Sequence, residues 1–325
     1  MRNIKVVACF AALTALSASA AAQEWPTRPV TMVVPYAAGS ASDLVARIIA
    51  PRLSEHLGKQ VIVENVPGAG GMTASVRVSG AAPDFYQFVL GNAGTHAQNQ
   101  TLYKSPLYDA AIDFAPVALI ATSSYVLIAR NDLPANNLQE FIAYTRENQA
   151  KMQFGSAGPG SGIHLACLLL NAAIGVNVTH VPYRGSPPAM QDLIADRIDY
   201  MCPIDGSVVG QIRSGSVKAL AILTKNRSPI LPDLASASEQ GLAGFDVSGW
   251  WGIFLPKGTP APIVQRLHDA TVAMLDTPSF RERMTEIGAG LPRPDQQSSQ
   301  YLSDLVKSEI EKWAPPIKAS GIVIE

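Results

Sequence analysis

Basic residues are neither numerous nor clustered in this sequence. The 25 Lys+Arg and 26 Asp+Glu residues leave a net charge of −1 at pH 7, and only 16% of the residues are charged. Proteins that bind nucleic acid rely on a basic surface, so the sequence predicts no nucleic-acid partner. The chain is not disordered either, because 47% of its residues are hydrophobic. Its 325 residues are enough for two domains of ordinary size.

Long apolar runs are also missing. The apolar stretch Val6–Leu16 is shorter than the roughly 20 residues that a membrane-spanning helix needs. It follows two basic residues and precedes the small residues Ser19–Ala22, which is the order of a secretory signal peptide. We therefore expect residues 1–22 to be a signal peptide cleaved near Ala22, and the remaining chain to be soluble and exported.

Cysteine is scarce, with three residues in the whole chain. Cys9 lies in the predicted signal peptide, so Cys167 and Cys202 would remain after cleavage. In an exported protein such a pair is a possible disulfide, but two separate buried thiols fit the sequence equally well.

Catalytic and cofactor-binding signatures are absent. The sequence contains no G-x-S-x-G, no G-x-x-x-x-G-K-[ST] and no H-E-x-x-H pattern. The glycine pairs at Gly68 and Gly158 lack the third glycine of a dinucleotide-binding loop. The five histidines are scattered along the chain. The sequence therefore predicts no enzyme activity, no cofactor and no metal.

What the sequence does contain is a strand, a loop of small residues and a helix within Val30–Arg47. The β-branched run Val30–Val34 predicts a buried strand, and the helix is expected to start near Asp43 with Ser42 or Asp43 as its cap. Backbone N–H groups at a helix start suit a carboxylate or phosphate. A single such loop is most often an ordinary turn, but similar loops recur along the chain.

The recurrence of this unit predicts an α/β fold. Strands at Gln60–Glu64 and Phe88–Leu90 are each followed by a glycine-containing loop and a helix, and a second series begins near residue 138. We expect two doubly wound, mostly parallel α/β domains joined by crossing strands. Domain I would comprise residues 23–124 plus 250–325, and domain II residues 125–249. Ligands of such sheets bind beyond the carboxyl ends of the strands.

The predicted loops contain many hydroxyl donors and few cations, which favours reversible binding of a small anion. The hydroxyl candidates are Ser40, Ser42, Thr95, Ser156, Ser161 and Ser186. His96 and His164 lie near helix starts, where a buried capping histidine is an equally good interpretation. Tyr36 and Tyr183 are candidates for the walls of a cleft or for core packing, and Arg184 for an anion contact or for solvent.

The sequence resembles the Bug-type receptors of tripartite tricarboxylate transporters, which are periplasmic binding proteins for organic acids. The resemblance covers nearly all of the mature chain, and it is carried in order by PYAAGSASDLVAR, ENVPGAGGMTAS, GNAGTHAQNQTLY, GSAGPGSGIHLA, HVPYRGSPPAMQDLIADRIDYM, KALAILTKNRSPILPDLASASEQGL and WGIFLPKGTPAPIVQRL.

This resemblance implies a periplasmic, monomeric receptor whose two domains close around a small organic acid and deliver it to inner-membrane transporter subunits. It implies that the loops Tyr36–Asp43 and Ser156–His164 face each other across the cleft. The loop composition and this resemblance together give the expected ligand-binding residues, with Asp205 implied by the resemblance alone: Tyr36, Ala38, Gly39, Ser40, Ser42, Asp43, Thr95, His96, Ser156, Gly160, Ser161, His164, Tyr183, Arg184 and Asp205.

Two residues depart from the family pattern, and two other functions stay open. Ser40 stands where the first loop usually has a second glycine, and Phe85 replaces the glycine usual after Asp84. A sensory module for a signalling partner, or an exported enzyme acting on a small carboxylate, would use the same cleft. The ligand itself is open among dicarboxylates, aromatic acids, acidic amino acids and nicotinate-like acids.

Overall fold

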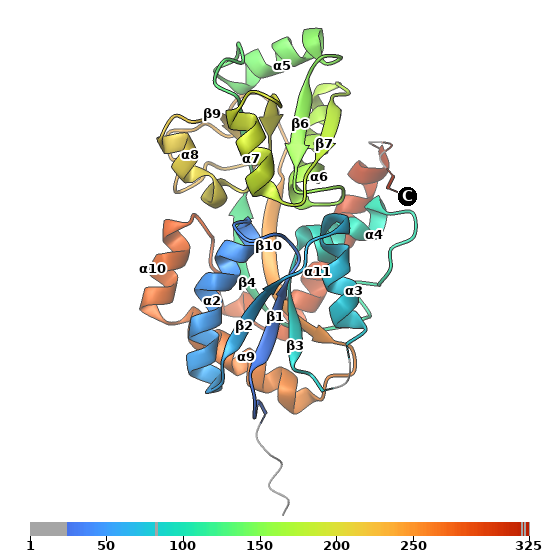
Figure 1. Ribbon diagram of the computed structural model, residues 1–325, viewed down its shortest axis with the longest axis vertical. Helices are drawn as coiled ribbons and strands as arrows, with labels where there is room; N and C mark the ends of the chain where they lie inside the picture. The colour runs from blue at the N-terminus through green and yellow to red at the C-terminus, as the bar shows by residue number, and fades with distance from the viewer. Residues whose placement is uncertain (1–24, 82–83, 320, 322, 325) are drawn as a thin grey trace, which may run out of the picture.

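The computed structural model describes residues 25–81, 84–319, 321 and 323–324. It contains two five-stranded sheets flanked by helices, which form two lobes (Figure 1). The predicted α/β class is confirmed. The predicted signal peptide lies outside the described residues. Within the described ranges, no helix is both long and apolar enough to cross a membrane.

The sheet of lobe I has the strand order β2-β1-β3-β10-β4. Its strands are β1 (Val30–Val34), β2 (Val61–Asn65), β3 (Gln87–Asn92), β4 (Phe114–Ser124) and β10 (Ser248–Pro256). Strand β1 runs parallel to β2 and β3, whereas β10 runs antiparallel to β3 and β4. The sheet is therefore mixed, not mostly parallel as expected, because the strand that returns from the other lobe enters it from the opposite end.

The sheet of lobe II repeats this pattern in the order β7-β6-β8-β5-β9. Its strands are β5 (Val126–Ala129), β6 (Gln153–Ser156), β7 (Thr179–Pro182), β8 (Tyr200–Met201) and β9 (Lys218–Ile222). Strand β6 is parallel to β7 and β8, and β5, which crosses over from lobe I, is antiparallel to β8 and β9. Both lobes thus present the carboxyl ends of their parallel strands toward each other (Figure 1).

Helices flank both sheets. In lobe I they are α2 (Ala41–Leu57), α3 (Met72–Ser79), α4 (Asn99–Leu102), α9 (Ala261–Leu275), α10 (Pro278–Glu286) and α11 (Ser299–Ala319). In lobe II they are α5 (Leu138–Asn148), α6 (Gly162–Ile174), α7 (Ser186–Ile194) and α8 (Val209–Arg213). The one-turn helices are η1 (Ala69–Gly71), η2 (Gly94–Gln98), η3 (Asp205–Ser207) and η4 (Pro294–Gln296).

The apolar core continues from one lobe into the other. A single cluster of buried side chains includes Met72 in lobe I and Phe154 in lobe II. It also includes Tyr125, at the junction of β4 and β5, and Trp250 on β10, and these are the two segments that cross between the lobes. Because the crossing segments are buried in this cluster, the connection between the lobes is packed and is not a free linker.

Phe85 stands in the turn before β3, where a glycine was expected from the resemblance. Its φ angle is 57°, in the left-handed region. An L-residue pays roughly 1–2 kcal/mol to adopt this conformation. The turn therefore has a backbone conformation that suits glycine, with phenylalanine at the position.

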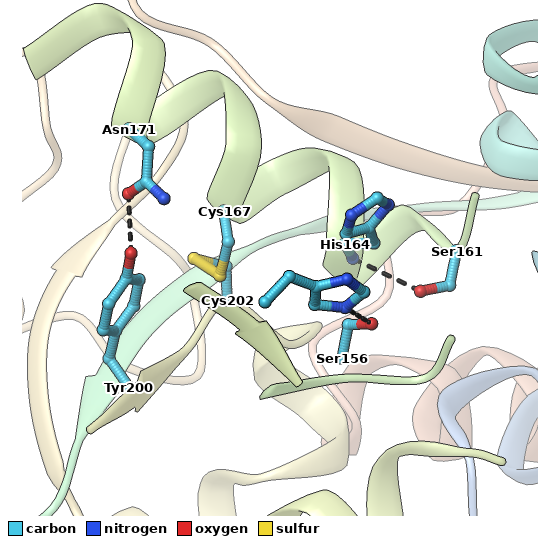
Figure 2. Close-up of a disulfide and its surroundings, with 8 residues drawn as sticks. Ser156, Ser161, His164, Cys167, Asn171, Tyr200 and Cys202 are labelled. Carbon is cyan, nitrogen blue, oxygen red and sulfur yellow. Dashed lines mark hydrogen bonds between the residues drawn. A yellow bond between two sulfur atoms is a disulfide. The ribbon is translucent and has the colours of Figure 1, made fainter. Parts of the chain in front are cut away.

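Cys167 and Cys202 form a disulfide, which decides a question that the sequence left open (Figure 2). It joins α6 to the end of β8, with 5.4 Å between the two Cα atoms and both side chains fully buried. The bond spans 35 residues of sequence. It therefore restricts a loop of substantial length in the unfolded chain.

We expect the double variant Cys167→Ala/Cys202→Ala to lose about 2–4 kcal/mol of unfolding free energy, because its unfolded chain is no longer cross-linked. Urea denaturation followed by circular dichroism measures the loss. Dithiothreitol should lower the stability of the wild type and leave the variant unchanged. Equal stability of variant and oxidised wild type would contradict a stabilising role for the disulfide.

Candidate functional site

A cavity lies between the two lobes where the carboxyl ends of the parallel strands meet. Its volume is about 330 Å³ when its solvent-filled mouth is included. Both lobes and the crossing segment line it, through Tyr36, Ser40, Ala41, Ser42, Asn92, Tyr125, Ala157, Ser161, Gly162, Ile163, Ser186 and Ile204. None of these described lining residues carries a formal charge. The cavity therefore offers neutral donors and apolar side chains.

The N-terminus of α2 faces this cavity. Ser40, not Ser42 or Asp43 as expected, is the cap of the helix, and its Oγ accepts a hydrogen bond from the backbone N–H of Asp43 at 3.3 Å. The hydroxyl proton of Ser40 is then free to donate outward to a ligand. The first N–H groups of any helix lack partners within it, so Ala41 and Ser42 offer further donors.

Two helices of lobe II begin at the same cavity. Ser161 caps α6, where its Oγ accepts from the N–H of His164 at 3.3 Å, and Ser186 is the first residue of α7. Both serines line the cavity. Three helix N-termini from two lobes thus converge on one space. Their partial positive charges and free N–H groups favour a bound anion.

Tyrosine and asparagine side chains complete the wall. The Tyr36 hydroxyl donates to the carbonyl of Gly70 at 3.2 Å, and burial raises the pKa of Tyr36 to about 12. Burial likewise raises the pKa of Tyr125, whose hydroxyl lies against Gly162 so closely that a Cβ there would overlap it. Both phenols therefore stay neutral at physiological pH. Asn92 donates to the Ser42 hydroxyl at 3.4 Å.

Asp43 and Gly39 are hydrogen-bonded to each other within the first loop. The N–H of Gly39 donates to the Asp43 carboxylate at 2.8 Å. Burial alone would raise the pKa of Asp43, but hydrogen bonds from Arg47, Gly39 and Asn65 lower it below its ordinary value. Asp43 shapes the loop, and Ala38 and Gly39 are exposed outside the cavity lining.

Thr95 and His96 lie in the core of lobe I instead of in the cavity wall. The His96 ring is fully buried and stacks on Phe254 with 3.9 Å between ring centres. Burial lowers the pKa of His96 to about 3, so the ring is neutral. Thr95 Oγ1 accepts from the N–H of Asn92 at 3.0 Å. The hydrogen bond between Thr95 and Asn92 therefore fixes the turn after β3, and it positions Asn92, which does line the cavity.

Ser156 and His164 (Figure 2) make hydrogen bonds that hold the second loop, Ser156–His164, and Gly160 belongs to the same network. The N–H of Gly160 donates to His164 Nδ1 at 3.1 Å, and the Ser156 hydroxyl is 2.7 Å from His180 Nε2. The two imidazole rings stack with 4.0 Å between their centres. Burial, followed by the neighbouring His180 ring, lowers the pKa of His164 to about 3. None of the three expected residues lines the cavity.

Tyr183, Arg184 and Asp205 are also outside the lining. The Tyr183 hydroxyl donates to Asp192 at 2.7 Å, and Arg184 is exposed. Asp205 is fully buried and accepts from Ser228 Oγ at 2.5 Å and from the N–H of Gly206 at 2.7 Å. Burial raises the pKa of this carboxyl group to about 6. Asp205 therefore holds the turn behind Ile204.

Of the fifteen residues expected at the ligand, the cavity brings together Tyr36, Ser40, Ser42 and Ser161. Ser186, recognised as a hydroxyl donor, joins them. The expected set did not contain the other lining residues, which are Ala41, Asn92, Tyr125, Ala157, Gly162, Ile163 and Ile204. Asn92 lies two residues after the predicted strand Phe88–Leu90, in the same loop as the recognised Thr95, so its position was a usable signal. Tyr125 and Ile204 meet only through a bridge between distant segments, which the sequence does not indicate.

The raised pKa of Asp205 predicts a pH-dependent stability. Between pH 4 and 6 folded Asp205 holds a proton that the unfolded chain has released, so the free energy of unfolding falls as the pH rises through this window, by up to about 3 kcal/mol. Asp205→Asn does not titrate and keeps a polar partner for Ser228. Its stability relative to the wild type, measured with urea at pH 4, 5, 6 and 7, should rise and then level off. A difference independent of pH would contradict this assignment.

Comparisons with known proteins agree over nearly the whole chain. The family model described as tripartite tricarboxylate transporter family receptor matches residues 45–322. A UPF0065 protein of Agrobacterium vitis, encoded in the TAR-I ttuE-ttuC' intergenic region, is 37% identical over 320 residues, which cover 98% of this chain and 92% of that protein.

Two solved structures share the fold at substantial sequence identity. The periplasmic binding protein BugD is 40% identical with a TM-score of 0.88, and the match covers 92% of this chain and 99% of BugD. MatC from Rhodopseudomonas palustris, with bound malate, is 40% identical with a TM-score of 0.87, covering 90% of this chain and all of MatC. The family and these neighbours are binding proteins, and the resemblance to Bug-type receptors is confirmed. The chain belongs to the tripartite tricarboxylate transporter receptor family.

Proposed function

We propose that this protein is an extracytoplasmic receptor that captures a small organic acid, as its carboxylate, between the two lobes. The observation that carries the proposal is the convergence of three helix N-termini on one uncharged cavity. Ser40, Ser161 and Ser186 each place a hydroxyl at that point, beside N–H groups that have no partner in their own helix. Such a set of donors matches the two oxygens of a carboxylate.

The absence of a cation among the described lining residues suits a receptor that must release its ligand. A bidentate arginine would hold a carboxylate by charge as well as by hydrogen bonds. Hydroxyl and N–H donors bind it through hydrogen bonds alone, so the acid dissociates more readily. Ala157, Ile163 and Ile204 supply apolar contact for the carbon skeleton of the acid. Because the similar protein MatC is described with malate, a short dicarboxylate is the first ligand to test.

Transport requires motion of the lobes and a partner in the membrane. We infer that residues 23–124 with 250–325 move as one body against residues 125–249, about the crossing segments. The closed, loaded form would then deliver the acid to the inner-membrane subunits of a tripartite transporter. Its place of action would be the periplasm, after removal of residues 1–22, and we expect it to act as a monomer.

The enzyme alternative has no support from the pair that comes nearest to a nucleophile and base. Ser156 and His180 are hydrogen-bonded, but Ser156 is fully buried and lies outside the cavity lining. Its hydroxyl is occupied by the backbone of Gly158 as well. A substrate in the cavity would not reach it.

The proposal predicts stabilisation by carboxylates. An acid present at 100 times its dissociation constant should raise the free energy of unfolding by about 2.7 kcal/mol, because it binds the folded protein alone. A thermal-shift screen would start with malate and extend to aromatic acids, acidic amino acids and nicotinate, with uncharged amides of the same acids as controls. The proposal would be refuted if no acid raised the melting temperature, or if the uncharged amides raised it as much as the acids.

Ser161→Ala tests the hydroxyl donor directly. Removing a hydrogen bond to a charged carboxylate should weaken binding by about 1–3 kcal/mol, measured by calorimetry with an acid found in the screen. The change also removes a helix cap, at about 0.5–2 kcal/mol of stability. Asn137→Ala is the matched control, because Asn137 caps α5 away from the cavity. It should lose stability without losing affinity, and equal affinities of both variants would show that Ser161 does not contact the acid.

A further inference from the structure

The lobes also touch at a second place, beside the ligand cavity. The hydroxyl of Tyr103, which follows α4 in lobe I, donates to the carbonyl of Pro159 in lobe II at 3.1 Å. The glycine-rich loop after β2 lies against the same segment, since a Cβ atom on Gly70 would collide with the Pro159 carbonyl and lie 2.7 Å from the Cα of Gly160. None of these four residues lines the cavity.

The fit between the two loops depends on glycine from both sides. Gly70 and Gly160 have φ angles of 60° and 77°, in the left-handed region. A Cβ atom on Gly160 would lie 2.7 Å from the ring of Tyr103 and 2.8 Å from the amide oxygen of Asn99. Side chains at these positions would hold the lobes apart. The backbones therefore approach each other at a distance that only glycine allows.

The same lobe II loop carries the cap of α6. The N–H of Ser161 donates to the carbonyl of Gly158 at 3.1 Å, and the N–H of Gly160 is bound to His164. The contact with lobe I and the cavity wall at Ser161 are thus parts of one internally bonded loop. The contact that holds this loop against Tyr103 therefore also keeps Ser161 at the cavity.

We propose that Tyr103 and Gly70 form a closure latch with Pro159 and Gly160. The latch exists only while the lobes are together, so it stabilises the closed form without touching the acid. The proposal rests on the proposed function in assuming that binding and closure are coupled. A group that stabilises only the closed form raises the apparent affinity in proportion to the closed population.

The first experiment needs no ligand. Spin labels on Lys59→Cys of lobe I and Gln191→Cys of lobe II, two exposed positions, follow the separation of the lobes without touching the latch. The distribution of distances between the two labels, measured by double electron–electron resonance, reports the closed population. The native Cys167–Cys202 bond is buried, so neither of its sulfurs takes a label.

In this background Tyr103→Phe should lower the ratio of closed to open protein about 2–10-fold, the effect of one net hydrogen bond. Gly70→Ala should lower it more than 10-fold, because its methyl group meets the Pro159 backbone. Tyr86→Phe and Gly58→Ala are the matched controls and should keep the ratio of the parent. Tyr86 makes its hydrogen bonds to Thr27 within lobe I, and a Cβ on Gly58, at φ 70°, meets nothing within 4 Å.

The second experiment uses malate as the probe, in variants without the added cysteines. Tyr103→Phe should raise the dissociation rate about 2–10-fold and leave the association rate and the melting of the ligand-free protein unchanged. If malate does not bind the wild type, that part of the proposed function fails, and the distances between the spin labels decide the latch alone. The same ratio of closed to open protein in Tyr103→Phe, Gly70→Ala and the controls would overturn the latch.

Discussion

The first N–H groups of an α-helix have no partner within the helix, and this constraint organises the molecule. Each lobe turns its parallel strands into helices at the edge that faces the other lobe, so the unpaired groups of α2, α6 and α7 point into one space. A serine stands at the start of each of these three helices, where a hydroxyl can accept a hydrogen bond from an unpaired N–H group. A cap hydroxyl accepts a bond from its own helix and still has a proton to donate, which makes one side chain serve both fold and binding.

The electrostatics of the surroundings agree with this arrangement. His96 and His164 are neutral because burial lowers their pKa values to about 3, and Tyr36 is neutral because burial raises its pKa to about 12. The nearest fixed charge in the first loop, Asp43, is neutralised by Arg47 and by two further donors. An acid entering the cavity therefore meets oriented dipoles, and neither a strong cation nor a repelling carboxylate dominates its binding.

The crossing segments connect the site to the rest of the fold. Trp251 on β10 donates its indole N–H to the Ser42 hydroxyl at 2.9 Å, so the strand that returns from lobe II contacts the start of α2 directly. Tyr125, on the other crossing segment, lines the cavity itself. Because these segments are buried in a core shared by both lobes, movement about them must be a repacking of specific side chains.

The sequence by itself determined the α/β class, the strand-to-helix units and the serines at the first and second loops. Those features are local: β-branched runs predict strands, and small or hydroxyl residues before an apolar helix predict caps. It did not distinguish Ser161, which faces the cavity, from His96, which stacks in the core, since both stand beside a helix start. Only the tertiary structure decided this, because burial depends on which distant segments pack against a residue. The same holds for the disulfide, for Tyr125 beside Ile204 and for Gly70 against Pro159, each of which joins segments that the chain keeps far apart in sequence.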